Sequence, residues 1–79
     1  MQSIYCCGNR GAVGFVRGWD FTETDATRVV DVHLTLNLED AYTFDRSDEN
    51  RAQLGAVLQY LRANAAVYGT VEVLGREEP

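Results

Sequence analysis

Residues 47–69 read SDENRAQLGAVLQYLRANAAVYG, the longest run in the chain with a helical hydrophobic period. Apolar side chains recur here at the three- and four-residue spacing of one helix face: Leu54, Val57, Leu58, Leu61, Ala65 and Tyr68. Asp45 or Ser47 can accept a backbone N–H of the first turn, and Gly69 stands where helices commonly end in a left-handed residue. The pattern therefore predicts one long helix over residues 47–68.

The remainder of the chain has the patterns of short strands, predicted at residues 2–7, 12–21, 28–39, 42–44 and 70–74. Residues 28–39 show the clearest alternation, with polar side chains between Val30, Val32, Leu34, Leu36 and Leu38. This period of two predicts a strand with one buried and one wet face. Residues 2–7 fit an edge strand.

The order of these elements predicts the topology. Short connections between the first strands favour antiparallel hairpins, and a right-handed crossover through the helix makes the last strand parallel to residues 42–44. The expected fold is a single α+β domain over residues 1–79. Its twisted, mainly antiparallel sheet has four or five strands, with the long helix packed on one face.

The charge of the chain favours protein partners over nucleic acid. Its 79 residues carry a formal charge of −5, and all seven basic residues are arginines. Phosphate contacts need an excess of cations, so we expect basic protein surfaces as partners and no direct nucleic-acid binding. The chain has no apolar run of membrane-spanning length, and residues 1–7 lack the pattern of a signal peptide, so the expected location is the cytoplasm.

The predicted topology brings the loop at residues 22–26 beside the start of the helix. Six carboxylates should then gather at one pole of the domain: Asp20, Glu23, Asp25, Asp45, Asp48 and Glu49. One interpretation is that they only cap, turn and solubilise the chain. The functional interpretation is an acidic pole that docks on an Arg- or Lys-rich surface. A Ca²⁺ site at Asp45, Ser47 and Glu49 is disfavoured because the glycine and distal glutamate of an EF-hand are missing.

The wet face of the predicted sheet is a second candidate contact surface. Its polar stripe, about 20 Å long, consists of Asp31, His33, Thr35 and Asn37. Such a face can dock a partner or pair in a homodimer, and both a monomer and a homodimer stay open. Tyr5, Phe15 and Trp19 are the candidate aromatic anchors, unless they belong to the core.

Catalytic and metal-binding motifs are weak in this sequence. A thiol mechanism needs a base near Cys6 or Cys7, and a Cys7–His33 dyad requires the first strand to lie beside residues 28–39. Structural zinc sites use four ligands in spaced pairs, which the chain does not offer. We therefore predict no enzyme activity, no cofactor and no metal.

In its general character this short, acidic chain resembles the small anti-CRISPR proteins of phages and mobile elements. The resemblance covers length, charge and the expected sheet-plus-helix fold, and no individual motif. It implies a non-enzymatic inhibitor that binds a CRISPR surveillance complex and blocks its nucleic-acid-binding surface. Two alternatives remain. One is a small accessory module that dimerises through a sheet edge or through the back of the helix, at Arg51, Gln59 and Arg62; the other is a small thiol enzyme.

Overall fold

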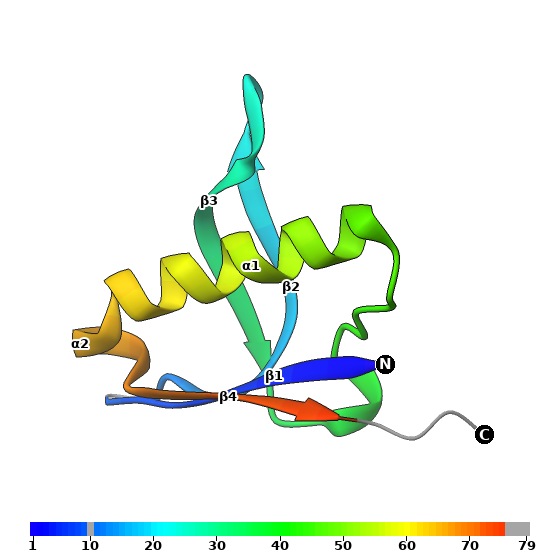
Figure 1. Ribbon diagram of the computed structural model, residues 1–79. Helices are drawn as coiled ribbons and strands as arrows, with labels where there is room; N and C mark the ends of the chain where they lie inside the picture. The colour runs from blue at the N-terminus through cyan, green and yellow to red at the C-terminus, as the bar shows by residue number, and fades with distance from the viewer. Residues whose placement is uncertain (10, 76–79) are drawn as a thin grey trace.

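The fold is an antiparallel sheet with one main helix on one face, which confirms the predicted α+β class (Figure 1). The computed structural model describes residues 1–9 and 11–75, and only the backbone of residues 25–27. Its elements are β1 (Gln2–Cys7), β2 (Val13–Thr22), β3 (Asp25–Thr35), the 3₁₀ turn η1 (Leu38–Asp40), α1 (Asp48–Ala63), α2 (Ala65–Tyr68) and β4 (Thr70–Gly75). The strand order is β3-β2-β1-β4, and α1 packs mainly against β3.

The helix forms where its hydrophobic period predicted it, but in two pieces. Ser47 caps α1 through its side-chain oxygen, which accepts the Asn50 N–H at 3.2 Å. α1 ends at Asn64, whose backbone leaves the helical conformation, and the Tyr60 carbonyl accepts both the Asn64 backbone N–H at 3.1 Å and its side-chain amide at 2.8 Å. The predicted inner face is confirmed at Val57 and Leu61, which are fully buried.

Three irregularities reset the faces of the long hairpin formed by β2 and β3. Val16 pairs with Leu34 and Gly18 with His33, so Arg17 is extra in β2, and Val30 is likewise extra in β3. Near the turn, Phe21 pairs with Val29 but Thr22 with Asp25, so β3 carries further extra residues there. Such bulges break the simple alternation on which the predicted inner faces rested. Val16 and Val29 are buried instead, whereas the predicted inner residues Val30, Leu36 and Leu38 are exposed. The strand also ends at Thr35 rather than at residue 39.

Residues 42–44 do not form a strand of the sheet, which corrects the predicted topology. β1 pairs with β2 only near the end of β1, and β2 then bends away (Figure 1). Residues 42–44 fill the resulting gap: Tyr42 N–H donates to the Val16 carbonyl at 2.9 Å, and Phe44 exchanges two backbone hydrogen bonds with Gln2. β1 is consequently central rather than an edge strand, and β4 pairs antiparallel with β1 instead of parallel with residues 42–44.

The core lies between the sheet and α1, with an aromatic cluster at the gap between β1 and β2. Phe44 is 1% exposed, stacks on Trp19 at a centroid distance of 5.4 Å, and meets Tyr42 edge-on at 4.8 Å. Trp19 therefore serves the core and is not a surface anchor. Among the helices of the described residues, none is long and apolar enough to cross a membrane.

Candidate functional site

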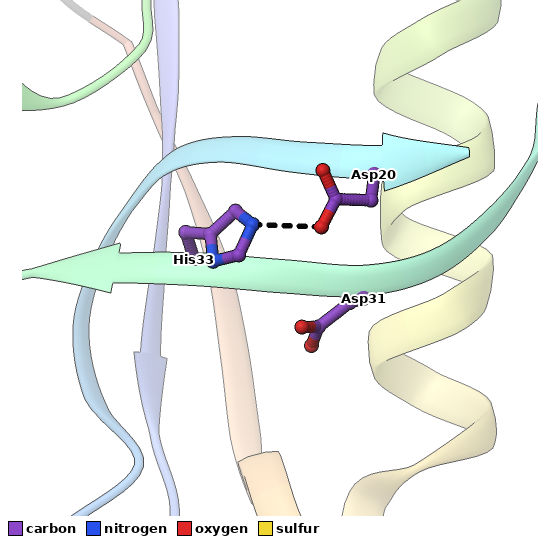
Figure 2. A group of neighbouring side chains, drawn as sticks. All are labelled: Asp20, Asp31 and His33. Atoms are coloured by element: carbon purple, nitrogen blue, oxygen red, sulfur yellow. Dashed lines mark hydrogen bonds and ion pairs between the residues drawn. The ribbon is translucent and has the colours of Figure 1, made fainter.

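Three polar side chains meet on the outer face of the sheet, the face of β2 and β3 opposite α1. Asp20 comes from β2, and Asp31 and His33 come from β3 (Figure 2). His33 Nε2 lies 3.0 Å from Asp20 Oδ2, and one ligand atom from each of the three residues lies within 4.8 Å of the others. We call Asp20, Asp31 and His33 the outer-face cluster.

The register of the hairpin assembles this cluster. Between the irregularities, Asp20 pairs with Asp31 and Gly18 with His33, so all four residues lie on the outer face. Like charges directly opposite each other in an antiparallel pair destabilise it, and the ion pair with His33 offsets that repulsion only when the imidazole is protonated. Sequence reasoning placed Asp20 with the acidic pole and missed its position beside Asp31, because that position depends on the irregular register.

The surroundings of His33 are mixed in character. A hollow beside it is lined also by Arg17, Gly18, Trp19, Leu34, Thr35 and Asp40, so it contains one further cation and one further carboxylate. Tyr5 and Phe15 pair on the outer face, half-buried, with ring centroids 5.1 Å apart.

The predicted polar stripe is thus present at Asp31, His33 and Thr35, which all lie on the outer face. Asn37 lies beyond the end of β3. Its side chain caps η1 by accepting the Glu39 N–H at 3.0 Å. Asp40 of η1 was not among the predicted site residues, although it lines the same hollow as His33.

The fold does not bring the six carboxylates of the predicted acidic pole into one cluster. Asp20 joins the outer-face cluster, and Glu23 lies in the turn of the β2–β3 hairpin. That turn and the first turn of α1 stand apart in the molecule (Figure 1). The reason is that residues 42–44 pair with Gln2 and so start α1 beside the beginning of β1. The side chain of Asp25 lies outside the described part of the structure.

The three carboxylates at the start of α1 have structural roles. Hydrogen bonds from the Ser47 side chain and backbone amide hold the pKa of Asp45 below its usual range. Asp48 and Glu49 lie in the first turn, where the helix dipole favours negative charge. A hollow beside them is lined by Asp45 and by the cations Arg46 and Arg51. Capping therefore accounts for these residues without a partner.

The two cysteines differ in exposure, and neither has a histidine partner on a neighbouring strand. Burial raises the pKa of the Cys6 thiol to about 11, whereas Cys7 is exposed. The predicted condition for a Cys7–His33 dyad is not met, since β2 lies between β1 and β3. His33 Nε2 contacts Asp20 instead.

We expect iodoacetamide to modify Cys7 of the folded protein near neutral pH and to leave Cys6 unmodified. The thiolate is the reactive form, and both burial and the raised pKa keep Cys6 in the thiol form. Intact-mass spectrometry should show one adduct on the folded chain and two in denaturant, and Cys7→Ser should remove the adduct from the folded chain. Equal labelling of both cysteines would mean that the end of β1 opens readily.

The described residues thus offer an exposed outer face with a compact polar cluster, and a helix start whose carboxylates are explained by capping. Comparison with known proteins gives no match to a family model and no significant match to a curated protein or to a solved structure.

Proposed function

We propose that this chain is a non-enzymatic inhibitor that binds, through its outer face, a basic nucleic-acid-binding surface of a larger host complex. The observation that carries the proposal is the placement of Asp20, Asp31 and Asp40 on or beside a sheet face that α1 leaves uncovered. None of these three carboxylates lies at the start of α1, where helix capping would explain it. Asp20 and Asp31 are cross-strand partners, and their repulsion costs stability.

The outer face also has the composition of a protein-binding surface. Tyr5 and Phe15 supply a half-exposed aromatic pair beside Thr35, at the β1 end of the hairpin, and aromatic side chains dominate the energetics of many interfaces. The molecule is a thin slab, 34 × 32 × 16 Å, so this face is one of its broad surfaces. The carboxylates of this face complement an Arg- or Lys-rich partner.

The resemblance to small anti-CRISPR proteins gives the proposal a specific form. A CRISPR surveillance complex holds its guide–target duplex in a positively charged channel, and an acidic slab at that channel would exclude DNA. The test is a competition assay in which labelled target DNA binds purified surveillance complexes, with increasing amounts of this protein. All partner-binding measurements include a chelator, so that no metal ion competes with the partner for the carboxylates.

Neutralising the outer face should weaken inhibition by about tenfold or more, because the charge pairs with the partner are lost. The variant is the triple change Asp20→Asn, Asp31→Asn and Asp40→Asn.

Inhibition by the unmodified protein should also weaken as salt rises from about 50 to about 300 mM, since surface charges are then screened.

The matched control removes the same charge at the start of α1, by Asp45→Asn, Asp48→Asn and Glu49→Gln. Ser47, which caps α1, is unchanged, and an asparagine side chain at position 45 can still accept the Ser47 N–H, so this variant should fold and inhibit normally. A greater loss in the control would move the docking surface to the helix start. Absence of inhibition of any surveillance complex would refute the anti-CRISPR form of the proposal.

A further inference from the structure

We propose that the outer-face cluster of Asp20, Asp31 and His33 binds a divalent transition-metal ion, with Zn²⁺ as the best match to its donors. The cluster offers one imidazole nitrogen and two carboxylate oxygens. Imidazole ligands favour Zn²⁺ and its transition-metal neighbours over Mg²⁺ and Ca²⁺, whereas Zn²⁺ accepts both nitrogen and carboxylate oxygen. This inference does not rest on the proposed inhibitory function.

The geometry is close to that of a three-ligand site. Two ligands of a tetrahedral zinc ion lie about 3.4 Å apart when each bond is about 2.1 Å. The distance of 3.0 Å from His33 Nε2 to Asp20 Oδ2 is near this value, and all three ligand atoms lie within 4.8 Å of one another. Asp20 is exposed, so a rotation about its side-chain bonds can bring its oxygen to an ion held by His33 and Asp31.

Space for the ion is available above the hairpin. Gly18 is the residue opposite His33, and a Cβ atom placed on Gly18 would meet no other atom within 4 Å. The backbone amide of Val32 donates to Asp31 Oδ1 at 2.9 Å, which fixes the carboxylate and leaves its second oxygen as the ligand. Three protein ligands leave a fourth position of a tetrahedral ion to water.

The charges of these same residues also favour a cation here. Asp20 and Asp31 are cross-strand partners, and like charges in such positions repel. A protonated His33 neutralises one carboxylate, but a divalent ion neutralises both. Arg17 lines the hollow beside His33. It is the extra residue of the bulge in β2, so it is not a cross-strand neighbour of Asp20 or Asp31. A divalent cation bound between the two carboxylates would relieve their repulsion.

The first test is calorimetric titration with ZnCl₂, carried out on a Cys7→Ser background because an exposed thiol is itself a zinc ligand. We expect one ion per chain, and a loss of affinity of about tenfold or more for Asp31→Asn and for His33→Gln. The matched control Asp48→Asn removes an exposed carboxylate elsewhere and should leave the affinity unchanged. Zinc at about ten times its Kd should raise the Tm by about 5 °C or more, and Mg²⁺ should not.

A second measurement locates the ion on the chain without changing a ligand. Paramagnetic Co²⁺ added to the ¹⁵N-labelled Cys7→Ser protein should broaden the amide signals of residues 18–20 and 31–33 first. The proposal is overturned if Cys7→Ser abolishes zinc binding, if His33→Gln leaves it unchanged, or if the broadening centres on the start of α1. Zinc and an arginine of a partner would compete for the two carboxylates, so the metal experiments are done without a partner and the inhibition assays with a chelator.

Discussion

Replacing Phe44 with alanine should lower the free energy of unfolding by about 3–5 kcal/mol, the range for a fully buried phenylalanine. The ring is 1% exposed, stacked on Trp19 and in edge contact with Tyr42. It fills the gap where β2 bends away from β1, and no neighbouring strand can close over the cavity. A domain of this length has a total stability of only about 4–12 kcal/mol, so this one substitution should remove a large fraction of it.

Urea unfolding followed by tryptophan fluorescence measures this effect directly. Trp19 is the only tryptophan of the sequence, and it lies against Phe44. Phe44→Leu keeps most of the volume and should cost less than about 1.5 kcal/mol, which provides a measurable step if the alanine variant does not fold. The matched control is Phe21→Ala, since Phe21 is 51% exposed and should cost about 0.5 kcal/mol or less. Equal midpoints for the two alanine variants would contradict a core role for Phe44.

The helix and the fold class could be predicted from sequence because their determinants are local. The apolar spacing over residues 47–69 predicted a helix, and its buried residues Val57 and Leu61 were among those predicted. Ser47 as cap follows from the chemistry of an oxygen that accepts a first-turn N–H. A single amphipathic helix among short strands has few ways to bury its face other than against a sheet.

The details of the sheet could not be predicted because they depend on register. Regular pairing outward from Thr22 and Asp25 would set Asp20 opposite residue 27, but the irregularities set it opposite Asp31. Arg17 interrupts the apolar side of residues 12–21, which is a local sign of a bulge near Gly18, but no local pattern identifies Val30 as an extra residue. The insertion of residues 42–44 beside Gln2 is a long-range event, and it also moved the start of α1 away from the β2–β3 turn.

The candidate site depends on the sheet register in the same way. Asp20 and Asp31 were assigned to two different surfaces, and only their cross-strand pairing unites them with His33. The alternation of Asp31, His33 and Thr35 was a valid signal, because β3 is regular over these residues. A signal for Asp20 would have required the bulge positions to be known first.

Replacing Gly8 with alanine should destabilise the fold by about 3 kcal/mol, since overpacking alone costs about 1–3 kcal/mol and a hydrogen bond is lost as well. A Cβ atom at Gly8 would overlap the Val67 carbonyl oxygen and lie 2.7 Å from the Tyr68 Cα. These are backbone atoms of α2, which cannot rotate away as a side chain could. Relief requires α2 to move off the end of β1, breaking the 3.1 Å hydrogen bond from Asn9 N–H to the Val67 carbonyl.

Gly55→Ala is the matched control because the chemical change is identical and the surroundings are empty. Gly55 is exposed in the middle of α1, and an added Cβ would meet no atom within 4 Å. Alanine there should raise the free energy of unfolding by about 0.5–1 kcal/mol through helix propensity. Amide hydrogen exchange distinguishes the mechanism, because exchange at Asn9 should accelerate in the Gly8 variant and remain unchanged in the Gly55 variant. If the two variants were equally stable, the end of β1 would not pack against α2. That packing fixes the position at which β4 begins beside β1, so another contact would have to do so.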